Sequence, residues 1–131
     1  MLERVGRGGR VLVLGNGGSA CDADRLVRLV AEWLPARSLL DTALLSALAN
    51  DVGATRMFAR QVETFATERD VIVAFSTSGA SPNVVEALAS AKRVGASTIA
   101  FVGYDGAGLP DSAELDVCLR VASSRDRKSV V

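Results

Sequence analysis

The sequence predicts an α/β fold built on a parallel sheet, and three observations support this. Short apolar runs at 11–14, 71–75 and 98–102 alternate with stretches whose apolar residues recur at helical spacing. These runs have the length and continuous hydrophobicity of strands that are covered on both faces. Two of them lead into loops rich in glycine and hydroxyl side chains. We expect a three-layer αβα sandwich with a five-stranded parallel sheet of the flavodoxin-like or Rossmann-like type.

Length and composition indicate one domain over residues 1–131, because 131 residues form one core more readily than two. Residues 1–9 are expected to be a short N-terminal lead, and 123–131 a loosely ordered or truncated tail. Fifteen basic and fifteen acidic side chains cancel, so neither nucleic acid nor a membrane surface is an expected partner. Residues 1–10 have no apolar signal-peptide core and no run approaches the length of a membrane span, so we expect a cytoplasmic protein.

The first half of the chain predicts two strands and three helices. Strand 11–14 is followed by a helix from Ser19 to Leu34, which Pro35 ends. A short strand at 38–40 leads into a helical stretch that breaks around 50–53. A helix over 55–67 then places three apolar side chains on one face, namely Phe58, Val62 and Phe65.

The second half predicts three strands and one helix. The strand at 71–75 leads to Ser81 and Pro82, an N-cap and the first position of a helix that ends at Gly95. A strand at 98–102 precedes a turn region at 103–108, and a fifth strand is expected at 115–119.

Two loops carry the candidate binding site. They comprise residues 15–19 and 76–81, and each directly follows a predicted strand and opens a helix. Unpaired backbone N–H groups at a helix N-terminus attract anions, and glycine lets an anion approach the backbone. Because the carboxyl ends of parallel strands lie at one edge of the sheet, the two loops together predict a site for a phosphorylated ligand.

The sequence contains no histidine, which removes the commonest metal ligand and the commonest general base. Cys21 and Cys118 match no zinc or CxxC spacing, and we expect them to be reduced and mostly buried. Neither a metal nor another cofactor is expected.

Three segments resemble the sugar isomerase (SIS) domain family, in particular its phosphoheptose isomerases: residues 15–23, 49–51 and 76–81. The resemblance extends from about Arg10 to Ser123. It implies binding of a phosphorylated sugar of the sedoheptulose 7-phosphate class and aldose-ketose isomerisation. It also implies that Ser76, Thr77, Ser78 and Ser81 bind the phosphate, whereas Asn16, Gly17, Gly18, Asn50 and Asp51 face the sugar.

The chain departs from this family at the positions that carry its chemistry. Phosphoheptose isomerases have a histidine and a glutamate, as metal and catalytic groups, where this sequence has Arg25 and Leu29. The segment that starts at Val121 resembles the approach to a further glutamine and histidine, which have no counterpart here. Among the residues that the resemblance places near the sugar, Asp51 is the only carboxylate and hence the candidate base. Arg25 could stabilise an oxyanion, and Glu63 and Glu86 are expected on solvated helix faces.

Three hypotheses therefore stay open. The protein is an isomerase that uses Asp51 or groups of a neighbouring chain, or a sugar-phosphate-binding or protein-interaction module without catalysis. Alternatively, Gly15-x-Gly17-x-x-Ala20, with Asp41 about twenty residues further on, belongs to a dinucleotide-binding domain. The resemblance and the high apolar content also imply a homo-oligomer, a dimer or tetramer, with Trp33 and Leu34 as candidate contacts.

Overall fold

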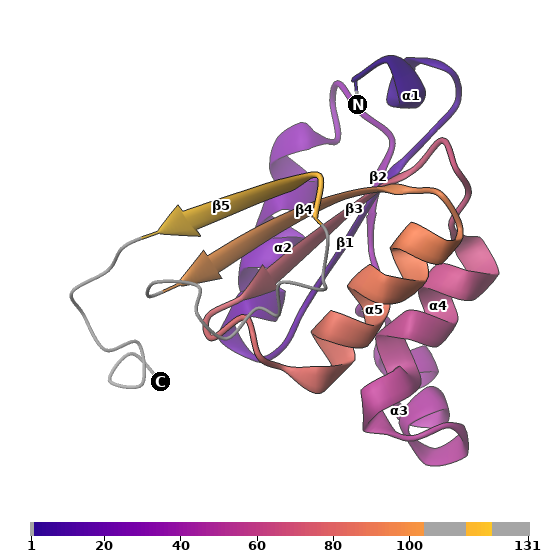
Figure 1. The fold of residues 1–131 in the computed structure, drawn as a ribbon, viewed down its shortest axis with the longest axis vertical. Coiled ribbons are helices and arrows are strands. Elements are labelled where there is room, and N and C mark those ends of the chain that lie inside the picture. The colour runs from indigo at the N-terminus through magenta and orange to yellow at the C-terminus, as the bar shows by residue number, and fades with distance from the viewer. Residues whose placement is uncertain (1, 104–114, 122–131) are drawn as a thin grey trace.

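The computed structural model describes residues 2–103 and 115–121 and has a five-stranded parallel sheet at its centre (Figure 1). The strand order is β2-β1-β3-β4-β5, which is the flavodoxin-like order and confirms the predicted fold class. The strands are β1 (Val11–Gly15), β2 (Ala36–Ser38), β3 (Val71–Ser76), β4 (Ser97–Gly103) and β5 (Val117–Val121).

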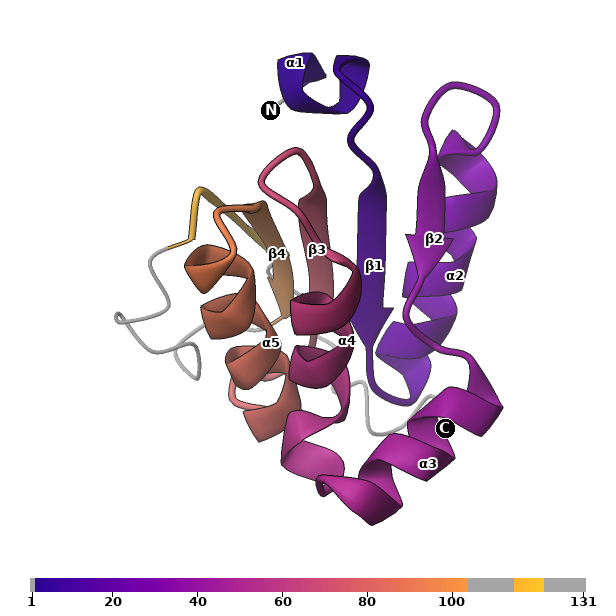
Figure 2. The same cartoon turned by 90° about the vertical axis from the view of Figure 1, so that its right-hand side faces the viewer.

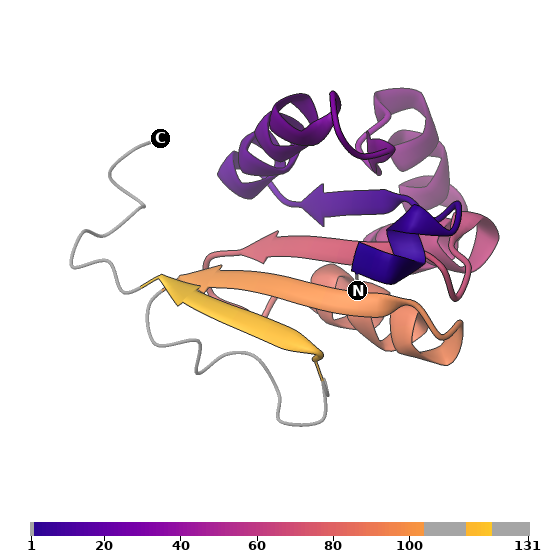
Figure 3. The same ribbon diagram turned by 90° about the horizontal axis from the view of Figure 1, so that it is seen from above.

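The helices form layers on both faces of the sheet (Figure 2). Helices α4 and α5 cover one face, and α2 covers the other. The helices are α1 (Leu2–Gly6), α2 (Gly18–Val30), α3 (Thr42–Asp51), the 3-10 helix η1 (Ala54–Arg56), α4 (Met57–Phe65) and α5 (Pro82–Arg93). The strand β5 lies at the outer edge of the sheet, next to β4 (Figure 3).

The alternation of side chains along the strands separates two hydrophobic clusters. Leu12 and Ile72 point towards α4 and α5, whereas Val13 and Val73 point towards α2. Phe58 and Val62 of α4 belong to the first cluster, as their helical spacing predicts. The continuous apolar runs of β1 and β3 are therefore explained by burial on both faces.

The predicted caps of α5 are confirmed. Ser81 is the N-cap residue, Pro82 begins the helix, and Gly95 follows its last turn with φ +81°. At the C-terminus the N–H of Gly95 donates to the carbonyl of Lys92, and the N–H of Ala96 donates to the carbonyl of Ala91, at 3.0 Å each. This is the Schellman arrangement, in which glycine adopts a positive φ without a steric cost.

Two predicted boundaries near Pro35 are wrong. Helix α2 ends at Val30 rather than Leu34, because the N–H groups of Trp33 and Leu34 both donate to the Val30 carbonyl in a tightened turn. Strand β2 occupies 36–38 rather than 38–40, because its pairing partner β1 begins at Val11, opposite Ala36. The apolar Leu39, which suggested the later position, is buried just beyond the strand.

Other boundaries shift less. The helix predicted over 55–67 is divided into η1 and α4. The fifth strand begins two residues later than predicted, because the Asp116 carboxylate accepts hydrogen bonds from Thr98 and only then does pairing with β4 begin. The predicted N-terminal lead contains α1, whose Val5 is buried. Residues 104–114 and the predicted tail 123–131 lie outside the described residues.

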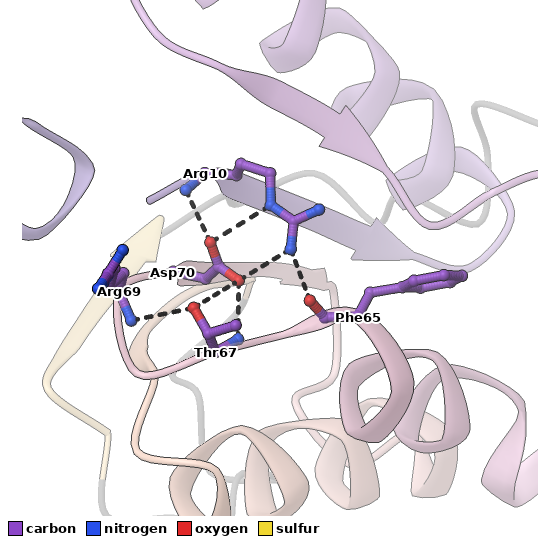
Figure 4. A network of polar contacts seen from close by, with 5 residues as sticks. All are labelled: Arg10, Phe65, Thr67, Arg69 and Asp70. Carbon is purple, nitrogen blue, oxygen red and sulfur yellow. Dashed lines mark hydrogen bonds and ion pairs between the residues drawn. The ribbon is translucent and has the colours of Figure 1, made fainter. Parts of the chain in front are cut away.

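A buried carboxylate ties the amino ends of β1 and β3 together (Figure 4). Asp70 accepts hydrogen bonds from the backbone N–H groups of Arg10 at 2.7 Å and of Thr67 at 2.8 Å. The Arg10 guanidinium lies 3.1 Å from the same carboxylate and also donates to the carbonyl of Phe65. This network lies at the edge of the sheet opposite the two predicted loops and is structural.

Candidate functional site

The two loops lie side by side, at the carboxyl ends of the neighbouring strands β1 and β3. The chain leaves β1 for β2 on one side and returns to β3 on the other, so β1 and β3 flank the point where the strand order reverses. Ligands of open α/β sheets bind at such a point, outside the carboxyl ends of the strands. The fold thus places the predicted loops where this class of site occurs.

The loop after β3 is held in shape by its own hydroxyl groups. The Ser76 hydroxyl accepts a hydrogen bond from the Gly79 N–H, and the Ser78 hydroxyl accepts one from the Ala80 N–H, each at 3.1 Å. Gly79 turns the chain with φ +73°. Because both serines use only their lone pairs in these bonds, their hydroxyl hydrogens stay available to an acceptor.

The N-terminus of α5 adds further hydrogen-bond donors beside this loop. Ser81 occupies the N-cap position, but its side chain makes no capping hydrogen bond. Within the described residues, the backbone N–H groups of Ser78, Ser81 and Asn83 have no hydrogen-bond partner. Free N–H groups, a free hydroxyl and the positive end of a helix suit a phosphate group.

The loop after β1 is open to solvent on its outer side. Gly17 has φ +53°, and an added Cβ at either Gly17 or Gly18 would meet no atom within 4 Å. The carbonyl of Asn16 accepts the N–H of Ser19 at 2.9 Å, which starts α2. The glycines therefore leave backbone accessible that no other part of the described chain covers.

A pair of side-chain amides joins the two loops. The Asn16 Nδ2 donates to the Asn83 Oδ1 at 2.8 Å, and the Asn83 Nδ2 donates to the Asn16 Oδ1 at 2.9 Å. Asn16 was predicted to face the sugar, whereas Asn83 was not predicted to belong to the site. No local pattern could have identified it, because its partner lies 67 residues away in the chain.

A pocket of about 350 Å³ opens beside these loops, on the side of the sheet that α2 covers. Polar residues from both loops line it, and α2, β4 and β5 supply mainly apolar walls. The lining residues are Ser19, Asp22, Arg25, Leu26, Leu29, Phe75, Ser76, Thr77, Phe101, Val102, Gly103 and Val121. Arg25 and Leu29, where the sequence leads us to expect a departure from the family pattern, both lie here. The rings of Phe75 and Phe101 stack with centroids 4.7 Å apart.

The pair Asn50 and Asp51 is separate from this pocket. Both are exposed at the end of α3, which lies past the carboxyl ends of β1 and β2 (Figure 2). The Asn50 amide donates to the Asp51 carboxylate at 3.3 Å, and neither residue lines the pocket. Of the other predicted residues, Ser76 and Thr77 line the pocket, whereas Asn16, Gly17, Gly18, Ser78 and Ser81 belong to the two loops but do not line it.

Glu63 and Glu86 both form ion pairs, on the side of the sheet opposite the pocket. Both contact Arg56, at 2.6 Å and 3.2 Å. The hydrogen bond from Arg56 lowers the pKa of Glu63, partial burial opposes it, and the Ser90 hydroxyl and the charge of Arg93 lower it further. This network joins η1, α4 and α5, so these carboxylates are structural rather than simply solvated.

The structure does not favour the dinucleotide-binding hypothesis. The Asp41 carboxylate, the candidate ribose ligand, instead caps α3 by accepting the Leu44 N–H at 2.8 Å. The loop after β3, which that hypothesis leaves unexplained, contributes Ser76 and Thr77 to the pocket.

The two cysteines are not buried as predicted. Cys21 and Cys118 are both exposed, because Cys21 lies on the outer side of α2 and Cys118 on the edge strand β5. Among the residues that the structure describes, no three cysteine, aspartate or glutamate side chains form a group that could hold a metal ion. No helix in the same ranges is long and apolar enough to cross a membrane.

Comparisons with known proteins point to the same family as the motifs. The SIS domain profile matches residues 1–103. The phosphoheptose isomerase of Citrifermentans bemidjiense is 47% identical over 123 residues, covering 88% of this chain and 64% of that protein. The chain thus spans slightly less than two thirds of that relative.

Two solved structures are similar to this chain along most of its length. Phosphoheptose isomerase GmhA from Neisseria gonorrhoeae superposes with a TM-score of 0.88 at 38% identity, covering 98% of this chain and 72% of the other. A phosphoheptose isomerase from Francisella tularensis has a TM-score of 0.87 at 33% identity, with coverage of 95% and 69%.

Proposed function

The chain belongs to the SIS domain family, and we propose on this premise that it is a phosphoheptose-isomerase-like protein. Its ligand is a phosphorylated sugar of the sedoheptulose 7-phosphate class, bound in the cytoplasm. The observation that carries this proposal is that Ser76 and Thr77 share one pocket with Ser19 of the first loop. The similarity to phosphoheptose isomerases along almost the whole chain supports it.

The phosphate binds at the loop after β3 and the start of α5. The N–H groups of Ser78, Ser81 and Asn83, which have no partner among the described residues, donate hydrogen bonds to the dianion. The hydroxyls of Ser76, Thr77, Ser78 and Ser81 are the further donors. No lysine is needed, because helix N-terminal amides and hydroxyls bind phosphate through charge-assisted hydrogen bonds. The sugar extends from there towards Asn16, Gly17 and Gly18. Asn50 and Asp51 do not line the pocket, and we propose that they approach the sugar from outside it.

Ser81→Ala tests the phosphate assignment with little risk to the fold, because the Ser81 side chain makes no capping hydrogen bond. One lost hydrogen bond to a charged group costs about 1.5–3 kcal/mol, which corresponds to about a 10- to 150-fold loss of affinity. We would titrate sedoheptulose 7-phosphate calorimetrically into both proteins. Ser46→Ala is the matched control, since Ser46 is exposed on α3 and only bonds the Ala43 carbonyl. Equal affinities of the Ser81 variant and the parent protein would contradict the assignment.

Isomerisation requires a base that moves a proton between two adjacent carbons through an enediol. We propose Asp51, or a group from a neighbouring copy, for this role. Leu29 cannot transfer a proton, and Arg25 is suited to stabilising an oxyanion instead. Neither can ligate zinc, so the residues present do not fit the metal site that the family resemblance implies, and no step is assigned to a metal.

Analysis of the sugars after the titration separates catalysis from binding. Conversion of the ketose to the aldose would identify an isomerase with a base other than histidine, and Asp51→Asn should then abolish turnover while retaining affinity. Asp22→Asn is the necessary comparison, because Asp22 is the carboxylate that lines the described pocket. Binding without conversion would identify a sugar-phosphate-binding module without catalysis.

We also propose that the protein assembles with copies of itself. Trp33 is 75% exposed, and Leu29 of the same segment is 60% exposed. Leu119 and Val121 of the edge strand β5 are exposed as well, and their register with Phe101 and Gly103 of β4 places them on the α2 side of the sheet. Leu34, in contrast, packs against the core. Sedimentation of Trp33→Ala and Leu119→Ser should show a smaller species than the parent protein, and an unchanged mass would contradict this interface.

A further inference from the structure

The reciprocal amide pair is the only hydrogen-bonded link between residues 16–19 and 77–83 in the described chain. Asn16 is the first residue after β1, and Asn83 is the second residue of α5. The two bonds, at 2.8 Å and 2.9 Å, run in opposite directions between the same two amides, and both side chains are half-buried. The pair therefore fixes both side-chain amides relative to each other.

The chemistry of the pair leaves each asparagine able to bind a ligand. An asparagine side chain has two N–H donors and an oxygen with two lone pairs. The mutual bonds use one donor and one lone pair of each residue, so one donor and one lone pair of Asn16 remain. A sugar hydroxyl both donates and accepts, and it matches this combination.

The glycines next to the amide pair indicate what the pair does for ligand binding. Gly17 follows Asn16 with φ +53°, and Gly79 turns the other loop with φ +73°. The Ser76 and Ser78 hydroxyls already constrain the second loop, whereas glycine leaves the first loop more backbone freedom, which costs entropy when a ligand must be held in one geometry. A side-chain link between the loops reduces this freedom before the ligand arrives.

We propose that Asn83 is a positioning residue, which orients Asn16 towards the sugar and holds the first loop at a set distance from the phosphate loop. This inference rests on the proposed function of the same site. Asn83 acts through Asn16 and through the spacing of the two loops. Aspartate at position 83 could accept from Asn16 but not donate to it, and alanine could do neither. Asn83→Ala therefore removes the link between the loops, whereas Asn83→Asp keeps one of its two hydrogen bonds and loses the other.

The test is a double-mutant cycle on ligand affinity with Asn16→Ala, Asn83→Ala and the double variant. Calorimetry with sedoheptulose 7-phosphate is run at a temperature at which all proteins are fully folded by circular dichroism. We expect Asn83→Ala to lose about five- to thirtyfold in affinity and the double variant to bind no more weakly than Asn16→Ala alone. Asn83→Asp should also weaken binding. Thr64→Ala, an exposed hydroxyl on α4, is the control.

A ligand-free measurement accompanies the cycle. The side-chain amide resonances of Asn16 are followed by NMR, and their hydrogen exchange should become faster in Asn83→Ala but not in Thr64→Ala. Unchanged exchange, or additive losses of affinity in the cycle, would overturn the positioning role. If the parent protein binds the sugar phosphate and Asn83→Ala binds it equally well, only this inference fails. If the parent protein does not bind it, the proposed function fails and the positioning role fails with it.

Discussion

Replacement of Asp70 by asparagine should destabilise the protein at neutral pH, and the loss of stability should become smaller at acidic pH. Asp70 is 1% exposed, and its two oxygens accept hydrogen bonds from the backbone N–H groups of Arg10 and Thr67 (Figure 4). Asparagine retains one acceptor oxygen and replaces the other by an NH₂ group. Whichever way the amide turns, its NH₂ group meets a backbone donor that then has no acceptor.

The expected loss follows from these contacts. A half-buried N–H left without an acceptor costs about 1–3 kcal/mol. The Arg10 guanidinium also loses its charged partner, but its side chain is 37% exposed, so water replaces much of that interaction. We expect a decrease in the free energy of unfolding of about 2–3 kcal/mol at pH 7. Asp24→Asn on the exposed side of α2 is the control and should change it by less than about 0.5 kcal/mol.

The pH dependence provides the sharper test. Burial alone would raise the pKa of Asp70, but the hydrogen bonds from the Arg10 side chain and from the backbone N–H groups of Thr67 and Arg10 outweigh burial and lower the pKa. A carboxyl with a lowered folded-state pKa stabilises the fold fully above its unfolded value of about 3.9, and this contribution is lost as pH falls through the folded-state pKa. Urea unfolding followed by circular dichroism should therefore show a smaller difference between parent and variant at about pH 3 than at pH 7. A difference that is the same at both pH values would refute this reasoning.

Three further substitutions test the core and the loops. Leu88→Ala removes a fully buried side chain of α5 and should lower the free energy of unfolding by about 2–5 kcal/mol in urea titrations. Gly9→Ala would bring a Cβ within 1.9 Å of the Arg69 carbonyl oxygen, so the backbone must shift, at a cost of about 1–3 kcal/mol in the same assay. Gly18→Ala should instead be neutral or stabilising, because its Cβ meets nothing within 4 Å and alanine favours helix α2. If the first loop contacts the ligand through its backbone, the Gly18 variant should nevertheless bind sedoheptulose 7-phosphate more weakly; equal affinity would place the ligand away from this glycine.

Most of the fold could be predicted because local signals and tertiary packing agree. The strand at 71–75 and the helix that begins at Ser81 and Pro82 combine a clear hydrophobic pattern with specific end signals. The predictions failed where contacts between distant segments, such as strand pairing, decide the secondary structure or the burial of a residue. Ala36–Ser38 has a weak strand signal and becomes β2 because β1 offers it an open edge. Likewise, Cys21 and Cys118 are apolar enough to suggest burial, but a helix surface and an edge strand expose them.

The features of the candidate site also fall into those that local sequence predicts and those that depend on contacts between distant segments. The two loops, with their hydroxyl groups and glycines, and the residues Arg25 and Leu29 could be identified without the structure, because each depends on neighbours within a few positions. Three-dimensional packing brings Arg25 and Leu29 into one pocket with Ser76 and makes Asp41 the cap of a helix. It also decided the pairing of Asn16 with Asn83, since contact between residues 67 positions apart depends on strand order, which leaves no periodic trace in the chain.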